Sequence, residues 1–179
     1  MKKTHANLQK LIFNSILLAA GLMLHQFMPP IFLGMKPDFL LSMMFIAIIL
    51  SDDYKSALII GIAGGILSAA TTGFPGGQIP NMIDKFVTCN FVYLLMRIFR
   101  FKFVLNKAAS QIQMAVISVS GTFVSGTVFL LSALLIVGLP GTFKSLFMIV
   151  VIPAMLLNTV IVAVVYNALC IALKRVHAA

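Results

Sequence analysis

The sequence predicts an all-α integral membrane protein, a single domain over residues 1–179 that forms a bundle of six transmembrane helices. Hydrophobic residues make up 61% of the chain and charged residues only 9%, and the mean hydropathy is +1.09. A soluble domain of this size could not bury so much apolar surface, because its exterior would be nearly as apolar as its core. Several apolar runs also approach the roughly 20 residues that a membrane-spanning helix needs.

Prolines, glycines and charged residues separate the six predicted helices. The first apolar run, residues 8–28, has spanning length and no small-x-small cleavage site, so we interpret it as a transmembrane helix rather than a signal peptide. Pro29 and Pro30 end this helix, because neither can donate a backbone hydrogen bond. The other five helices are predicted at residues 38–50, 56–72, 81–99, 111–137 and 144–173. Asp38 is placed to cap the second helix, and Pro153 to bend the sixth.

The distribution of basic residues predicts the orientation of the bundle. Thirteen Lys and Arg residues face four Asp and Glu residues, and the net charge is +9. If the N-terminus is inside, that side holds most of the bases: Lys2, Lys3, Lys10, Lys55, Arg97, Arg100, Lys102, Lys107, Lys174 and Arg175. The other side holds Lys36, Lys85 and Lys144. Because Lys and Arg accumulate in cytoplasmic loops, both termini are predicted to be cytoplasmic. No tract of arginines and aromatics points to a nucleic-acid partner.

Small residues recur on three of the predicted helices at about four-residue spacing. On the third helix they are Ala57, Gly61, Gly64, Gly65, Ser68 and Ala69, and on the fifth Ser118, Gly121, Thr122, Ser125 and Gly126. Such residues let two helix backbones approach closely in lipid, which favours internal packing for these two helices. On the first helix, Ser15 and Ala19 are compatible either with internal packing or with docking of another membrane subunit.

The polar segment Phe74-Pro-Gly-Gly-Gln-Ile-Pro-Asn-Met-Ile-Asp-Lys85 lies between two apolar runs, on the predicted outer side. Its polar or conformationally special residues are Gly76, Gly77, Gln78, Asn81, Asp84 and Lys85. Adjacent glycines let backbone approach a ligand closely, and the free N–H groups of the helix that begins here favour an anion. We therefore predict that the segment forms much of a binding pocket for a small zwitterion. The alternative is that its prolines only turn the chain and Asp84 only caps a helix.

The sequence alone does not assign a role to each charged group around this pocket. Lys36 or Lys85 could pair with a ligand carboxylate, and Asp38 or Asp84 with a ligand ammonium group. For Asp38, helix capping alone is the simpler interpretation.

Aromatic and amide side chains could complete the pocket. Phe74 and Phe143 could face an aromatic ligand, and Gln78, Asn81 or Asn158 could bond to a ring N–H. Asn158 lies about one turn after Pro153, and a contact between helices is equally compatible with a buried amide there.

Other chemistries find no support in the sequence. Three scattered histidines and two distant cysteines, Cys89 and Cys170, do not form a metal site, and no cofactor is expected. The stretch 141–145 contains Gly, Lys and Ser but lacks the glycine directly before lysine that a phosphate loop requires. Because no acid, base and nucleophile stand together, we do not expect an enzyme.

The motifs at 34–38 (Gly-Met-Lys-Pro-Asp) and 74–85, together with Leu-Leu-Ile-Val-Gly-Leu-Pro-Gly within 126–141, carry a family resemblance. The chain resembles the tryptophan-transport proteins of Gram-positive bacteria, which look like substrate-binding S components of energy-coupling-factor (ECF) transporters, a class of ABC transporter. The resemblance implies a six-helix bundle that captures a vitamin or amino acid at its outer face and associates with a transmembrane coupling subunit and two ATPase subunits. It also implies docking through small residues of the first helix, where the matching positions are Ser15 and Ala19.

The leading hypothesis is therefore capture of tryptophan, or a related aromatic small molecule, by a multi-pass protein of the bacterial cell membrane. A stand-alone, ion-coupled secondary transporter of an aromatic amino acid is the first alternative, with Asp84 as its only plausible coupling acid. A structural membrane protein without a small ligand is the second alternative.

Overall fold

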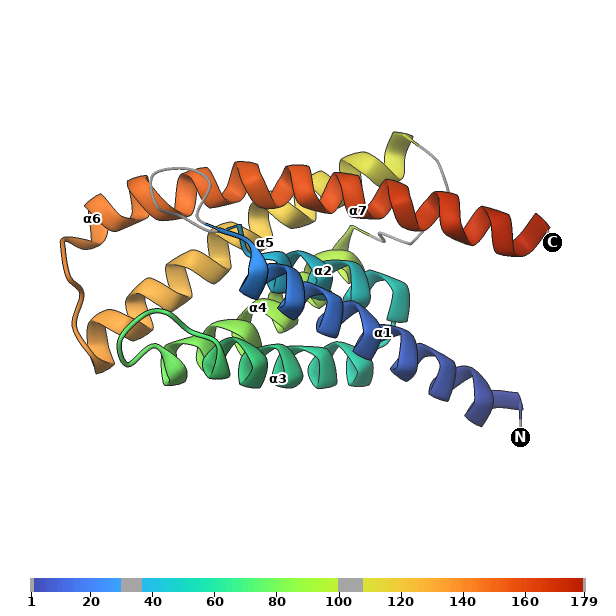
Figure 1. Ribbon diagram of the computed structural model, residues 1–179, viewed down its shortest axis with the longest axis horizontal. Helices are drawn as coiled ribbons and strands as arrows, with labels where there is room; N and C mark the ends of the chain where they lie inside the picture. The colour runs from blue at the N-terminus through green and yellow to red at the C-terminus, as the bar shows by residue number, and fades with distance from the viewer. Residues whose placement is uncertain (1, 30–36, 100–107, 179) are drawn as a thin grey trace.

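The computed structural model describes residues 2–29, 37–99 and 108–178, and over these ranges it contains helices and their connections but no strand. The elements are α1 (Lys2–Phe27), α2 (Phe39–Ser51), α3 (Tyr54–Ala70), α4 (Gln78–Ile98), α5 (Ala108–Ile136), α6 (Phe143–Leu146), the π-helical turn η1 (Phe147–Val151) and α7 (Ile152–Ala178). The last three elements follow one another without a break and correspond to the sixth predicted helix (Figure 1). The all-α prediction is confirmed.

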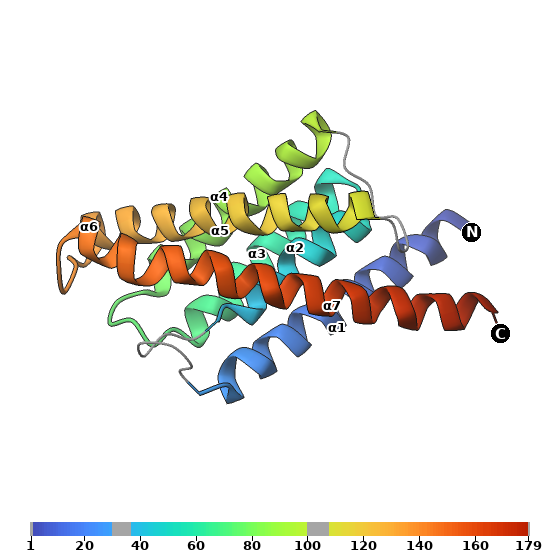
Figure 2. The ribbon, with the colours of Figure 1, turned by 90° about the horizontal axis from the view of Figure 1, so that it is seen from above.

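Both termini lie at one end of the elongated bundle, which we call the termini end. The connection between α3 and α4 and the connection between α5 and α6 lie at the opposite end, the loop end (Figure 1). A view turned by 90° gives the same arrangement (Figure 2). Successive long helices therefore alternate in direction, which returns the C-terminus to the end where the chain starts.

Helix α2 is the centre of the bundle and packs against α1, α3, α4, α5 and α7. All of its residues except Phe39 and Leu50 are buried, as expected for a helix that is apolar on every face. Its N-terminus is capped as predicted, because Asp38 Oδ1 accepts the N–H of Leu41 at 2.9 Å. At 1.5 Å per residue its 13 residues extend about 20 Å, so α2 is too short to cross the roughly 30 Å hydrocarbon core by itself.

Glycines on α3 and α5 allow the helices to pack closely around this centre. A Cβ atom at Gly61 of α3 would collide with the Cys89 side chain of α4. A Cβ atom at Gly121 of α5 would come within 2.6 Å of the Phe45 ring of α2. The small residues of α3 and α5 are thus internal packing positions, which confirms that prediction.

The outer surface of the bundle is apolar. Leu135, Leu156 and Ile16 are exposed by 84%, 68% and 58%. Three helical segments are long and apolar enough to cross a bilayer: Leu8–Phe27, Ser110–Ile136 and Phe143–Ala172. A surface of this composition is unfavourable in water and suits lipid. The fold is therefore that of a multi-pass membrane protein.

The helix that contains Pro153 continues through it, with a local change of hydrogen bonding. The N–H of Ile152, directly before the proline, bonds to the carbonyl of Phe147, five residues earlier. Proline has no N–H and its ring crowds the carbonyl four residues before it, so a wider π turn accommodates it. The turn also places Val151, which is buried, opposite Gly126 of α5.

Candidate ligand-binding site

A cavity of about 280 Å³ lies at the loop end of the bundle. This volume is near the lower limit of the roughly 300–1,000 Å³ usual for small-molecule sites. Polar or titratable side chains that line it come from the loop-end portions of six helices and their connections: His25, Asp38, Ser68, Thr71, Thr72, Asn81, Asp84, Lys85, Thr122, Ser125 and Asn158. Apolar lining includes Phe74, Phe129, Val151 and Ala154. The cavity thus combines charged, hydroxyl, amide and aromatic groups.

Lys85 is the central charged group of the cavity wall. Its Nζ lies 2.7 Å from Asp84 Oδ2, 3.1 Å from Asp38 Oδ2 and 3.5 Å from Ser125 Oγ. A lysine ammonium has three donors, so each can be directed at one of these oxygens. The Lys85 side chain is only 3% exposed. It therefore joins α4 to the N-terminus of α2 and to α5.

The two carboxylates that bind Lys85 differ in their surroundings. Asp84 is buried, and its second oxygen accepts the hydroxyl hydrogen of Thr88 at 3.0 Å, one turn later in α4. Asp38 also pairs with Lys85 and caps α2, but 29% of its side chain is exposed. Asp84 is thus enclosed by the protein, whereas Asp38 has a face open to the cavity.

Asn158 of α7 connects the same cluster to two further segments. Its Oδ1 accepts the backbone N–H of Asp38 at 2.9 Å, and its Nδ2 donates to the Thr122 hydroxyl of α5 at 3.3 Å. The residue is fully buried. Its amide therefore joins helices, which was one of the two roles that the sequence left open. Asn158 also borders the cavity.

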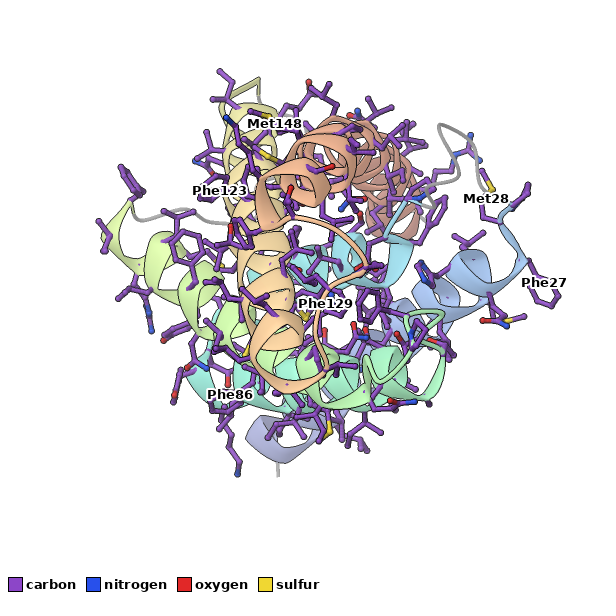
Figure 3. All side chains as sticks on the ribbon, turned by 90° about the vertical axis from the view of Figure 1, so that its left-hand side faces the viewer. Phe27, Met28, Phe86, Phe123, Phe129 and Met148 are labelled. Carbon is purple, nitrogen blue, oxygen red and sulfur yellow. The ribbon has the colours of Figure 1, made fainter. Side chains whose placement is uncertain are left out.

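An aromatic pair forms the apolar side of the cavity. Phe74 and Phe129 meet edge to face, with ring centroids 5.5 Å apart and planes at 84°. Viewed from the loop end, Phe129 lies near the middle of the bundle, whereas Phe27 and Phe86 point outward (Figure 3). An indole or phenyl ring is chemically compatible with such a wall, because aromatic groups favour edge-to-face contacts.

His25 at the end of α1 also reaches the cavity. Its Nδ1 lies 3.1 Å from the carbonyl oxygen of Pro37 and 4.0 Å from Asp38 Oδ1. His25, Ser125 and Phe129 were not among the ligand-binding residues predicted from the sequence. Ser125 was predicted to pack between helices, and Phe129 lies four residues later on the same face of α5.

The structure brings together part of the predicted site. Six of the predicted residues line the cavity: Asp38, Phe74, Asn81, Asp84, Lys85 and Asn158. Four others are not in its lining: Gly76, Gly77, Gln78 and Phe143. Lys36 lies outside the described residues.

Local geometry accounts for the four residues outside the cavity lining. Gly76 has a φ of +70° and forms the turn before α4, and Gly77 is the N-cap residue. Gln78 is exposed on the first turn of α4, which begins three residues earlier than predicted. Phe143 stacks on Phe147, with ring centroids 6.0 Å apart. These residues shape the connections at the loop end.

The two predicted docking residues, Ser15 and Ala19, are exposed on α1. The Ser15 hydroxyl donates to the Leu11 carbonyl of its own helix at 2.9 Å. The neighbouring Asn14 is buried and donates to Ser51 Oγ of α2 at 2.7 Å. Helix α1 therefore turns Asn14 toward the bundle and the two small residues away from it.

Other site chemistries are not represented in the described part of the chain. It contains no group of three or more His, Cys, Asp or Glu residues suited to a metal ion. Cys89 and Cys170 are buried free thiols, as predicted.

A helical bundle with an apolar outer surface and a charged cavity at one end defines a multi-pass membrane transport protein. The chain belongs to the family described as tryptophan transporter TrpP, whose family model matches residues 7–174. Its relatives come from bacteria, so this multi-pass chain belongs in a bacterial membrane.

Three relatives cover nearly the whole chain, and each is described as a probable tryptophan transport protein. The protein of Clostridium acetobutylicum is 49% identical over 162 residues, which are 90% of this chain and 92% of the relative. The protein of Bacillus subtilis is 46% identical over 93% of this chain and 94% of its own length. The protein of Clostridium perfringens is 42% identical over 94% of this chain and 95% of its own length. No solved structure matches the chain significantly.

Proposed function

We propose that this protein is the membrane-embedded substrate-capture component for uptake of tryptophan, and that separate coupling and ATPase subunits energise the uptake. The observation that carries the proposal is the cavity at the loop end, where a charged cluster stands beside an aromatic pair. The family and its three relatives, all described as tryptophan transport proteins, support the choice of ligand.

The chemistry of the cavity matches the two halves of tryptophan. The amino-acid end needs charged or strongly polar partners, which Asp38, Asn81 and the nearby hydroxyl groups supply. The indole ring needs an apolar wall, for which Phe74 and Phe129 are suited. In such a site, apolar contacts hold most of the ligand and a few polar groups orient it.

The proposed energy source rests on the resemblance to S components and on the outer face of α1. Ser15 and Ala19 are small and exposed there, so a helix of a coupling subunit could approach α1 closely. The excess of basic residues in the segments of the termini end supports a cytoplasmic location for that end, where ATPase subunits would act.

Two measurements test this proposal. Calorimetric titration of the purified protein in lipid nanodiscs with L-tryptophan is expected to give saturable binding with a dissociation constant in the micromolar range or below. Affinity purification from the host membrane is expected to recover a coupling subunit and ATPase subunits. Absence of binding by a folded sample would overturn the choice of ligand, and recovery of the chain without ATPases would overturn the energy source.

Ion-coupled uptake by this chain alone is the second candidate function. It is favoured by the enclosed cluster of Asp38, Asp84 and Lys85, since ionisable groups buried within membrane bundles often mark ion or substrate pathways. Proteoliposomes that contain only this protein would accumulate tryptophan under a proton or sodium gradient in this case. The first proposal predicts no accumulation in the same vesicles.

A further inference from the structure

We propose that the cavity recognises its ligand through a cationic ammonium group held by Asp38, and that Lys85 does not bind the ligand carboxylate. This inference rests on the proposed function and specifies which half of the zwitterion the cavity selects. It follows from how exposed each charged side chain of the cavity wall is and from how many partners it already has.

The positive charge in the wall is already enclosed and bonded. The Lys85 ammonium has oxygens of Asp84, Asp38 and Ser125 within 3.5 Å, which uses its three donors. Its side chain is 3% exposed. A ligand carboxylate would have to displace one of these partners, and displacing Asp84 or Asp38 would leave a buried carboxylate without its cation.

The negative charge, in contrast, is accessible. Asp38 keeps 29% of its side chain exposed, whereas the Asp84 side chain is 1% exposed. Within residues 2–29, 37–99 and 108–178, Asp38 Oδ1 accepts the N–H of Leu41 and Oδ2 accepts the ammonium of Lys85, while His25 Nδ1 lies farther away, 4.0 Å from Oδ1. A carboxylate has about four acceptor sites in all. Asp38 can therefore accept further hydrogen bonds from a ligand ammonium without losing its present contacts.

The charged groups that the structure describes in the cavity wall also favour a ligand ammonium over a ligand carboxylate. Two carboxylates, Asp38 and Asp84, share one lysine, and the remaining titratable group nearby is His25, with Nδ1 4.0 Å from Asp38 Oδ1. A ligand ammonium adds the missing positive charge. A ligand that brings only a carboxylate would place like charges together, which is unfavourable.

Two analogues of tryptophan separate the contributions of its charged groups. Tryptamine has the indole and the ammonium but no carboxylate, and indole-3-propionate has the indole and the carboxylate but no ammonium. We would measure how each displaces radiolabelled tryptophan from the protein in nanodiscs, with empty nanodiscs as the control for partition into lipid. Indole-3-propionate is expected to bind at least about 30-fold more weakly than tryptamine.

The variant Asp38→Asn tests the assigned residue. Asparagine keeps an oxygen that can cap α2 but removes the charge, so tryptamine is expected to lose at least about tenfold in affinity and its advantage over indole-3-propionate to shrink. Asp52→Asn is the matched control. Asp52 is exposed at the termini end with a φ of +53°, which asparagine tolerates well, so the preference for tryptamine should be unchanged.

The outcomes separate this inference from the proposed function. If tryptophan binds and indole-3-propionate competes as well as tryptamine, recognition through the ammonium is overturned while tryptophan capture stands. The same holds if Asp38→Asn is folded and keeps the full preference. If the wild-type protein binds no tryptophan, the proposed function fails and this inference fails with it. Because the analogue comparison uses the wild-type protein, it does not depend on whether a variant folds.

Discussion

Polar side chains gather at both ends of the bundle, but they are arranged differently. At the loop end, the buried Lys85 and Asn158 bind partners on other helices around a cavity, and the buried Asp84 pairs with Lys85. At the termini end, Arg97 is exposed and bonds to Tyr93, one turn earlier in the same helix, at 2.8 Å.

Other contacts at the termini end join neighbouring helices in pairs. Tyr54 of α3 donates to Asn90 of α4 at 3.0 Å in an exposed position and packs against Tyr93, with ring centroids 5.3 Å apart. The Asn14–Ser51 pair is buried but joins only α1 and α2. Tyrosines and arginines in exposed places suit the interface between membrane and water. The comparison teaches that the convergence of charged side chains from several helices on a cavity, rather than polarity or burial alone, distinguishes the candidate site.

Among the substitutions that test the difference between the two ends, removal of the Lys85 charge should have the largest effect. Lys85→Met leaves the buried Asp84 and the partly exposed Asp38 without their cation, and we expect a loss of about 3–5 kcal/mol in unfolding free energy together with the loss of tryptophan binding. Chemical unfolding in detergent and calorimetric titration would measure both. Lys55→Met, an exposed lysine at the termini end, should change neither quantity measurably. If the two variants lost equal amounts of stability and binding, the loop end would not differ from the termini end in the way described.

Asn158→Leu should have the next largest effect. The substitution leaves the N–H of Asp38 and the hydroxyl of Thr122 without their partner, which costs about 1–3 kcal/mol for each buried group left unsatisfied. We expect a lower melting temperature and at least about tenfold weaker tryptophan binding, because Asp38 is displaced. Asn167→Leu is the control on the same helix, since Asn167 bonds to Gln111 in an exposed position. Unchanged binding in Asn158→Leu would show that its contacts do not position Asp38.

Gly61→Ala should affect stability without changing ligand selectivity. The new methyl group would collide with Cys89 and force α3 away from α4, at a cost of about 1–3 kcal/mol. Cys89→Gly in the same chain should recover part of the loss by making room. Thermal unfolding with and without saturating tryptophan would measure this. Failure of the second substitution to restore any stability would contradict the packing at this position.

Ser125→Ala should have the smallest effect. Its hydroxyl lies 3.5 Å from Lys85 Nζ, the longest of the three contacts, so we expect a decrease of only about threefold in tryptophan affinity. Ser120→Ala, which removes an exposed hydroxyl bonded within α5, is the control. A loss as large as that of Lys85→Met would mean that Ser125 binds the ligand directly.

The sequence was sufficient to predict features that depend on local patterns. Long apolar runs and proline–glycine connectors predicted six helices, with most ends within three residues, although α1 begins six residues earlier and α7 ends five residues later than predicted. Asp38 was recognisable as a cap because it directly precedes an apolar helix. The polar segment 74–85 was recognisable because few other stretches combine these residue types, and four of its residues line the cavity: Phe74, Asn81, Asp84 and Lys85.

Features that depend on how helices face one another could not be predicted in the same way. Ser125 and Phe129 are ordinary residues of α5 until the helix is rotated toward α4, and His25 approaches Asp38 only after α1 has packed on α2. Gln78 belongs to the polar segment but is exposed, because it is the first residue of α4 and lies about one helical turn before Asn81 and two before Lys85, toward the end of the bundle. Segment composition identified the region, and helix rotation decided which side chains line the cavity.

The absence of tryptophan from this chain permits a direct test of the central claim, namely that the loop-end cavity holds the indole ring. Any indole emission in a titration comes from the ligand, and it should shift to shorter wavelength as the ring leaves water for the wall of Phe74 and Phe129. We predict a saturable blue shift with the wild-type protein that Phe129→Ala weakens. Emission that stays at the wavelength of free tryptophan, or a shift that Phe129→Ala leaves unaltered, would contradict the account.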